Sequence, residues 1–584
     1  MPAEQTPAPA PARPSLIGLL KPYAGLIWAL IALTILGNAL NLLVPRVMSR
    51  AIDSYARQEL VIATFTLEFF FIAVGIFVFA YLQNVLQTYA SERVARDLRT
   101  DLVAKISAQD HAYIQQVTPH ILLTNLTSDV DAVKTFVSQA VAALVSSIFL
   151  IIGASALLLS INWKLGLAVL AILPIVGGTF AAVLGRVRPL FTKSQEAIDW
   201  LNKVINESIL GSALIRLVNS QQHEYDKFLA ANTRARDISL SILRLFAGLI
   251  PVIMFSTNLA TLTILMLGGR FVIAGSMSLG DFTAFNSYLA ILIFPVIIIG
   301  FMSNVMAQAG ASYLRISLVL NAPTPADTGT ETADHLRGDI AVRNVSVTLG
   351  GKAVLRDVSF AAGAGTRTAV IGPTAAGKTQ LLYLLTGLLK PTAGTVAYDG
   401  RPIDDYHKAS LHAHIGFVFQ DTVIFNLTLR ENIAFSRAVT DEHLEKAIET
   451  AELRAFVDGL PDKLNTVVSE RGTSLSGGQK QRIMLARALA LNPRVLLLDD
   501  FTARVDSTTE RKILDNVRRN YPGITLLSVT QKIAPVEDYD QIILLMEGEV
   551  LASGTHRQLL ETSPEYVQIH DSQRSTSHYE LHAQ

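Results

Sequence analysis

The sequence contains no cysteine and few charged residues, and both shortages narrow its chemistry. Without cysteine the chain forms no disulfide and has neither a thiolate metal ligand nor a cysteine nucleophile. Charged residues make up 17% of the chain, against about 25% in ordinary soluble proteins, whereas hydrophobic residues reach 50%. The 49 basic and 49 acidic residues cancel, so bulk electrostatics predicts no nucleic-acid partner. The composition disfavours a wholly soluble protein.

Long stretches without charge concentrate before residue 320. About 20 apolar residues in a helix cross the hydrocarbon core of a bilayer, and helices in a soluble core rarely run so long without a charge. Six stretches meet this length, so we predict an all-α transmembrane domain of six helices, in contact with membrane lipid. They are residues 22–45, 69–91, 135–163, 165–185, 245–269 and 282–314.

Lysine and arginine are distributed unevenly between the connections. They gather in residues 92–134 and 186–244 and are sparse in the other connections, so the positive-inside rule puts these two segments and both termini in the cytoplasm. Both are far longer than ordinary loops. In the second, apolar residues such as Ile198, Leu201 and Ile205 recur at helical spacing. We therefore expect long helices that protrude into the cytoplasm. We also expect the protein to lie in a bacterial inner membrane.

A phosphate-binding motif follows the apolar run TRTAVIG and precedes the helix-forming QLLYLLTGLL. The pattern GxxxxGK[ST] needs this strand, loop and helix context, because main-chain N–H groups of the loop bind phosphate oxygens. Lys378 is expected at the β and γ phosphates and Thr379 at Mg²⁺. Asp499 ends a second apolar strand, where a P-loop ATPase holds its metal. The predicted ATP-binding loop is Gly372, Pro373, Thr374, Ala375, Ala376, Gly377, Lys378 and Thr379.

The segment LSGGQKQR lies between these two motifs, and Gln420 stands in GFVFQ. With these motifs in this order, the chain resembles the ATP-binding-cassette transporter family, of the exporter type that fuses six spans to one nucleotide-binding domain. The resemblance covers essentially everything after the first residues. It also extends to GEVLASGTHRQLL near the end and to NKVINESILGSALIRLVNSQQHEYDKF, which is similar to the family's second intracellular connection with its short transverse helix.

Composition divides the chain into five segments. Residues 1–14 are an Ala/Pro-rich tail expected to be disordered, without the pattern of a signal or transit peptide, and 15–321 form the transmembrane domain. A linker (322–337) leads to a cytoplasmic α/β P-loop ATPase domain (338–572) with a mainly parallel sheet, and 573–584 form a C-terminal tail.

In this family Mg-ATP lies between the phosphate loop of one nucleotide-binding domain and the LSGGQ of another. The resemblance therefore implies Thr379, Gln420 and Asp499 as Mg²⁺ ligands and a second half-transporter chain as partner. A serine hydroxyl and glycine amides at a helix N-terminus suit an anion. The residues that serve the partner's site are Ser476, Gly477, Gly478 and Gln479.

Four departures from the family pattern lie in or beside the site built on this chain's own phosphate loop. The catalytic glutamate is Asp500, one methylene shorter, and misplacement by about 1 Å can cost on the order of a hundredfold in rate. The switch histidine is Gln531, which cannot carry the charge of an imidazole. The loop that contains Asp506 reads ARVD instead of SALD, and Leu349 replaces the aromatic residue that stacks on adenine.

These departures predict a chain that binds ATP at its own site but hydrolyses it poorly, while its LSGGQ completes a partner's active site. A heterodimeric exporter of a small or amphipathic molecule fits this asymmetry. Three alternatives remain: a homodimeric exporter with slow hydrolysis, an importer of exporter architecture as in some siderophore uptake systems, and an ATP-gated regulatory subunit that transports nothing.

Other polar residues give weaker signals. Glu68 lies at the start of the second span, either as a functional carboxylate or at the membrane interface. Polar residues within the spans either line a cavity or join helices by hydrogen bonds; these are Asn38, Asn41, Asn84, Gln87, Asn258, Asn304 and Gln308. The 12 histidines show no HExxH or paired spacing, so the sequence does not support a zinc site.

Overall fold

The computed structural model describes residues 15–325, 329–469, 472–501 and 505–582, and the chain divides into two compact units. The helical unit runs to Ala108 and from Val117 to Pro323, and the α/β unit comprises residues 109–116 and the chain from Thr324. The predicted tail, residues 1–14, and part of the predicted linker, residues 326–328, lie outside the described residues.

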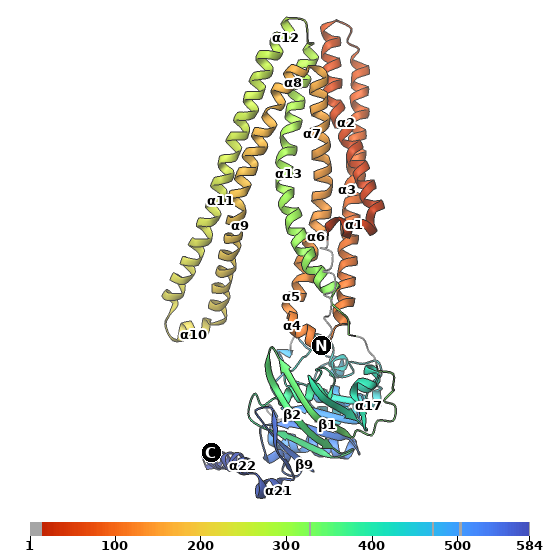
Figure 1. Cartoon of the computed structure of the whole chain (residues 1–584), viewed down its shortest axis with the longest axis vertical. Helices are drawn as coiled ribbons and strands as arrows, with labels where there is room; N and C mark the ends of the chain where they lie inside the picture. Colours follow the sequence, from red (N-terminus) through yellow and green to blue (C-terminus); the bar gives the residue numbers. More distant parts are fainter. Residues whose placement is uncertain (1–14, 326–328, 470–471, 502–504, 583–584) are drawn as a thin grey trace, which may run out of the picture. The chain divides into compact units, whose positions relative to one another are not determined.

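Helices account for nearly all of the helical unit (Figure 1). They are α1 (Leu16–Leu20), η1 (Lys21–Tyr23), α2 (Ala24–Ala56), α3 (Ile62–Ser107), α5 (Pro119–Thr124), η2 (Asn125–Asp129), α6 (Val130–Thr135), η3 (Phe136–Ala140), α7 (Val141–Ile161), α8 (Trp163–Leu170), α9 (Ile172–Leu210), α10 (Ser212–Leu217), α11 (Gln221–Thr263), η4 (Ile264–Gly268), α12 (Gly269–Ile273) and α13 (Leu279–Leu320).

Six of the described helical segments are long and apolar enough to cross a membrane, which confirms the predicted number of spans. Each carries an 18-residue window of mean hydropathy between 2.0 and 2.5. The segments are Gly18–Ala56, Ile62–Ser107, Pro119–Ile161, Trp163–Leu210, Gln221–Ile273 and Leu279–Leu320. Each has 39 residues or more, about twice the length that a bilayer core needs, so helix remains beyond the apolar part of every span.

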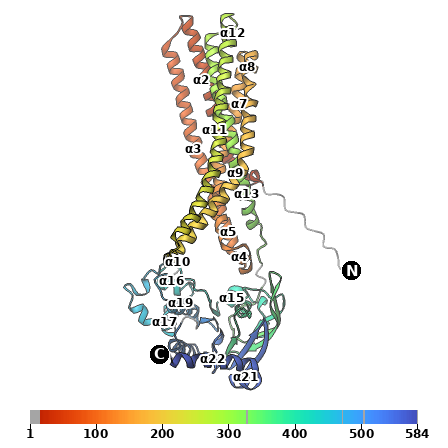
Figure 2. The same cartoon turned by 90° about the vertical axis from the view of Figure 1, so that its left-hand side faces the viewer.

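The second long connection forms a helical hairpin, as its apolar periodicity predicts. Helices α9 and α11 lie side by side and end at the short helix α10, which both views show (Figures 1 and 2). Large apolar side chains at this turn are exposed, among them Leu210, Leu214 and Leu217 at 63% or more. The exposed apolar surface at this turn is therefore available for burial against another protein segment.

Two of the polar residues in the spans join helices, and a third bonds within its own helix. Asn38 donates from Nδ2 to Ser146 Oγ at 2.8 Å, and Gln87 donates to the carbonyl of Ser138. Asn41 donates to Gly37 O of its own helix. Glu68 pairs with Arg50, so its charge has a partner from the first span.

Two sheets form the framework of the α/β unit. A six-stranded sheet has the order β10-β9-β3-β8-β7-β6, in which all neighbours are parallel except β9 and β10. The sequence predicted this mainly parallel sheet but not the second one, a four-stranded antiparallel sheet of order β2-β1-β4-β5. The strands are β1 (Ile340–Leu349), β2 (Lys352–Ala362), β3 (Arg367–Ile371), β4 (Ala393–Tyr398), β5 (Arg401–Pro402), β6 (Ile415–Val418), β7 (Val495–Asp499), β8 (Thr525–Thr530), β9 (Gln541–Met546) and β10 (Glu549–Gly554).

Alternate residues of the parallel strands enter two different apolar cores. Leu496 and Leu498 pack with the helical face, whereas Val495 and Leu497 pack with β1, β2 and α14. A strand buried on both faces needs an unbroken apolar run, and VLLLD supplies it. The helices are α14 (Lys378–Leu385), η5 (Ile403–Asp405), α15 (Lys408–His412), α16 (Leu429–Ile433), α17 (Asp441–Thr450), α18 (Arg454–Asp458), η6 (Lys463–Asn465), α19 (Gly477–Leu489), α20 (Ser507–Asn520), η9 (Ala534–Val536), α21 (His556–Thr562) and α22 (Pro564–His582).

Two features of the α/β unit differ from the predicted domain boundaries. Residues 109–116, which contain all but the last residue of the short helix α4 (His111–Val117), belong to this unit. The ring of His111 meets Tyr383 edge-on at 5.3 Å between centroids. Helix α22 continues across the boundary at residue 572 that the sequence suggested. Local composition does not mark the first feature, because it depends on a contact with a distant segment.

Candidate nucleotide-binding site

Four adjacent parallel strands end at one edge of the six-stranded sheet. Residue pairs Ile371 with Thr530, Asp499 with Val529, and Val418 with Leu498 stand in register across β3, β8, β7 and β6. Loops that follow the carboxyl ends of parallel strands meet at such an edge, which is where α/β proteins bind ligands. The sheet therefore brings together the phosphate loop after β3, Gln531 after β8, Asp499 and Asp500 at the end of β7, and Gln420 after β6.

The phosphate loop has a backbone that only small residues allow. Gly377 adopts φ +96°, and a Cβ there would lie 2.6 Å from Leu355 Cδ2 and 3.0 Å from the carbonyl of Val354. At Gly372 a Cβ would lie 2.0 Å from the carbonyl of Leu545. The two glycines let the loop pack tightly between β2 and β9. The main-chain N–H groups at the start of α14 have no intrahelical partners and suit phosphate oxygens.

Lys378 begins α14, and its side chain folds back over the loop. Its Nζ donates hydrogen bonds of 2.8 Å to the carbonyls of Gly372 and Pro373. Burial lowers the pKa of Lys378, and the charges of Asp500 and Asp499 oppose that shift. The ammonium group is thus held at the mouth of the loop, where it can neutralise phosphate charge.

Asp499 and Thr379 form the part of the site that suits a metal ion. Thr379 Oγ1 donates to Asp499 Oδ1 at 3.3 Å, and Asp499 is 2% exposed. Its second oxygen, Oδ2, is buried without a hydrogen-bond partner among the described residues. Burial raises the pKa of Asp499 to about 6, and the nearby Asp500 adds to this shift. A buried carboxylate oxygen without a donor beside a hydroxyl fits Mg²⁺, which prefers oxygen ligands.

The residues at the catalytic and switch positions have their own local contacts. Asp500 adopts φ +45°, a conformation that aspartate tolerates better than most residues, and its main-chain N–H donates to Val529 O at 2.9 Å. Gln531 donates from Nε2 to Thr374 Oγ1 at 3.4 Å. The amide of Gln531 therefore reaches the phosphate loop.

Leu349 stands at the end of the β1–β2 hairpin. It pairs with Lys352 and is 41% exposed, and β2 continues to Val354 and Leu355, which contact Gly377. The hairpin that carries Leu349 thus packs directly against the phosphate loop.

The LSGGQ segment forms the start of α19. Ser476 is the N-cap: its Oγ accepts from Gln479 N at 3.2 Å, and its own N–H donates to Gln479 Oε1 at 2.8 Å. Gly477 and Gly478 occupy the first turn, where helical N–H groups lack intrahelical partners. Among the described residues, the segment makes no hydrogen bond with the phosphate loop, Asp499 or Gln531.

Asp506 caps the next helix, α20. One of its carboxylate oxygens accepts from Thr509 N at 2.9 Å, and this hydrogen bond lowers the pKa of Asp506. The preceding Ala503 and Arg504 lie outside the described residues.

Sequence reasoning missed two groups near the site. The charge of Asp421, which follows Gln420, contributes to the raised pKa of Asp499. Its position directly after the glutamine could have identified it from the sequence. Gln573 of α22 donates from Nε2 to Gln531 O at 2.7 Å and accepts at Oε1 from Ile533 N at 2.9 Å. No local pattern could have linked two segments 42 residues apart.

A helical unit with six potential membrane spans, joined to an α/β unit with a phosphate loop at the strand ends, defines a membrane-spanning P-loop ATPase. Residues 27–296 match the family model described as the ABC transporter transmembrane region, and residues 355–503 match the model described as ABC transporter. The chain belongs to the ABC transporter family and has the exporter fold, with both parts fused in one chain.

Relatives match over nearly the whole length. The uncharacterized ABC transporter ATP-binding protein YfiB of Bacillus subtilis (strain 168) is 31% identical over 95% of this chain and 98% of its own length. The ATP-dependent lipid A-core flippase of Thiobacillus denitrificans (strain ATCC 25259 / T1) is 29% identical over 96% and 98%. A bacterial Atm1-family ABC exporter with ATP bound has a similar fold, with a TM-score of 0.78 and 22% identity over 94% of this chain and 98% of that one.

Proposed function

We propose that this chain is one half of a heterodimeric exporter of a small or amphipathic molecule, with the α/β unit on the cytoplasmic side of a bacterial inner membrane. The chain offers two surfaces to nucleotide. The phosphate-loop surface consists of residues 372–379 with Gln420, Asp499, Asp500 and Gln531, and the signature surface consists of residues 476–479. The observation that carries the proposal is that the first departs from the family pattern at its catalytic positions and the second does not.

The phosphate-loop surface retains what is needed to hold Mg-ATP. Main-chain N–H groups of the loop and the Lys378 ammonium would neutralise the β and γ phosphates, and Thr379, Gln420 and Asp499 would hold Mg²⁺. The buried, unpaired Oδ2 of Asp499 supports that assignment. When bound, the ion neutralises charge that develops on the phosphate oxygens.

The same surface is less suited to hydrolysis. Asp500 has a carboxylate one methylene nearer the backbone than glutamate, so it reaches less far toward a water aligned with the γ phosphate. Gln531 shares its amide with Thr374 and cannot carry a positive charge. Both changes leave ATP binding intact and weaken the orientation of the attacking water.

The signature surface supports the opposite role. Ser476 and Gly477 are exposed at the start of α19, and the capping box orders the first turn without help from another segment. Exposed helix N-terminal N–H groups favour an anion that another chain brings. The signature surface of this chain would therefore complete the ATP site of a partner chain whose phosphate-loop surface is intact.

A cavity in the helical unit supports a small amphipathic substrate. It has a volume of about 650 Å³ between α2, α7 and α13. Its lining is mostly apolar, with Asn41, Ser146 and Ser287 among the polar side chains. A second cavity of about 410 Å³ between α11 and α13 also borders Ala290 and Phe294. Cavities of this size and character take drug-sized molecules.

The decisive experiment isolates the tag-free complex from its native host in nanodiscs, identifies its chains by intact mass and measures ATP turnover. We expect a second chain of different mass, and turnover that survives Asp500→Ala here but not removal of the partner's catalytic glutamate. Two copies of this chain with turnover that depends on Asp500 would contradict the proposal. Flux of substrate into inside-out vesicles separates export from import and from an ATP-gated regulator without flux.

A further inference from the structure

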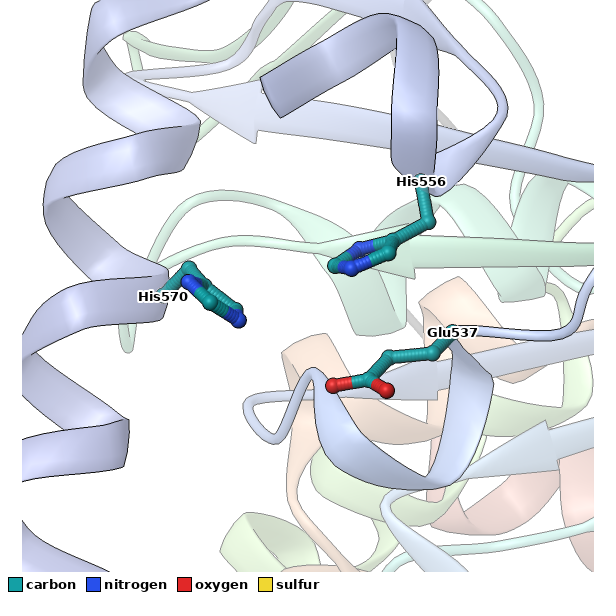
Figure 3. Close-up of side chains that lie close together, drawn as sticks. All are labelled: Glu537, His556 and His570. Atoms are coloured by element: carbon teal, nitrogen blue, oxygen red, sulfur yellow. The ribbon is translucent and has the colours of Figure 1, made fainter.

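Three side chains capable of binding a metal converge at the C-terminal part of the α/β unit. Glu537 follows η9, His556 begins α21, and His570 lies in α22. One ligand atom of each, a carboxylate oxygen or a ring nitrogen, lies within 4.8 Å of the others. Figure 3 shows the two rings and the carboxylate directed toward a common space between the three segments. They are far apart in sequence, which is why motif spacing did not reveal them.

We infer that Glu537, His556 and His570 form a divalent metal site of the zinc type. Two imidazoles and a carboxylate are an established Zn²⁺ ligand set, with metal–ligand distances of about 2.0–2.2 Å and a fourth position left for water. Neighbouring ligands around tetrahedral zinc lie about 3.3 Å apart. The three groups would therefore move together by about 1.5 Å at most, within reach of side-chain rotation.

The hydrogen bonds around the two rings orient them for this role. His556 Nδ1 lies 2.7 Å from the hydroxyl of Tyr566, which is fully buried, and His570 Nδ1 lies 3.2 Å from Asp571 Oδ1. A histidine that binds a metal commonly donates its other N–H to an oxygen, which fixes the tautomer and the ring plane. With Nδ1 engaged in both rings, Nε2 of each is the nitrogen available to the metal.

The site would fasten α22 to the segment that carries Gln531. Gln573, three residues after His570 and so on the same face of α22, already bonds to Gln531 O and Ile533 N. Glu537 lies at the other end of this segment. A metal bound by Glu537 and His570 would add a second attachment between α22 and residues 531–537. Metal binding at this site does not depend on the proposed function.

The test titrates zinc sulfate into the tag-free full-length protein in nanodiscs after chelator treatment, without nucleotide, in competition with a chromogenic zinc indicator. We expect about one Zn²⁺ per chain. His556→Gln and His570→Gln should each weaken binding at least a hundredfold, and Tyr566→Phe about tenfold through the ring that it orients. The control His335→Gln changes an exposed histidine of the same unit and should bind zinc like the wild type.

A second readout separates a metal site from an ordinary cluster of polar side chains. Zinc should slow hydrogen exchange in α22 and in residues 531–537 of the wild type but not of His570→Gln. Lys378→Ala, which disables the phosphate loop, should still bind zinc, so failure of the proposed function leaves this result unchanged. Zinc binding of equal strength in the wild type and in the double variant His556→Gln/His570→Gln would overturn the inference.

Discussion

The two surfaces that this chain offers to nucleotide are built in different ways, and the difference indicates where substitutions are tolerated. The phosphate-loop surface is assembled from the segments that follow four strands, so a side chain on one segment can change while those on the other segments stay. The signature surface is one helix start, in which Ser476 and Gln479 hold each other by reciprocal hydrogen bonds. A change in the helix start disturbs the whole surface, whereas Asp500 and Gln531 can vary while Lys378 and Asp499 stay.

The largest effect is expected at Ser476. Replacing it by alanine removes the N-cap hydroxyl. We expect turnover of the complex to fall by on the order of a hundredfold, because in the proposed function this hydroxyl stabilises phosphate charge in the partner's site. The matched control is Thr555→Ala, which removes the same kind of capping box from α21 at a similar cost in helix stability, about 1 kcal/mol. Phosphate release measures both. Equal losses in the two variants would mean that Ser476 acts only as a cap.

The next effect tests the other surface. Asp500→Glu should raise hydrolysis at this chain's own site by roughly tenfold to a hundredfold, because the longer carboxylate reaches the attacking water. The measurement is phosphate release from a complex whose partner site has been inactivated. Asp515→Glu lengthens an exposed aspartate of α20 and should change nothing. No gain in the Asp500 variant would show that the shorter side chain is not what limits this surface.

A smaller effect is expected at the adenine position. Leu349→Tyr should tighten ATP binding roughly fivefold, since stacking on the base contributes about 1 kcal/mol. Fluorescent nucleotide titration measures the affinity, and Leu551→Tyr, at a similarly exposed leucine of β10, is the control. If both variants bind ATP like the wild type, the β1–β2 hairpin does not contact the base.

The sequence predicted those parts of the fold and site that depend on local patterns. Charge-free runs longer than a bilayer core identified six spans, and the apolar strand before Asp499 indicated a parallel strand buried on both faces. Comparison with the family pattern also identified the positions that differ from it, because each of these positions follows a strand or loop that the sequence makes recognisable.

What the sequence could not predict depends on contacts between distant segments. Gln531 meets Thr374, Gln573 of α22 meets Gln531, and His556 meets His570 only after the sheet has ordered the intervening chain. The antiparallel sheet was missed for a similar reason. Along its strands, buried and exposed side chains alternate as in any half-buried strand. This alternation does not determine whether neighbouring strands pair in the parallel or the antiparallel direction.

The smallest effect concerns the stability of the α/β unit, at a buried glutamate of α20 near Lys532. Glu510 of α20 is 3% exposed, and burial raises its pKa from 4.5 to about 7, with Lys532 opposing the shift. The folded state therefore holds a proton that the unfolded state releases, so the stability that the neutral carboxyl provides is complete below pH 4.5 and is lost as the pH rises through about 7. Glu510→Gln should thus raise Tm by a few degrees at pH 8 and have little effect at pH 4.5. Thermal unfolding of the full chain measures this, with Glu561→Gln, an exposed glutamate of α21, as the control. A gain of equal size at both pH values would show that the charge of Glu510 does not destabilise the fold.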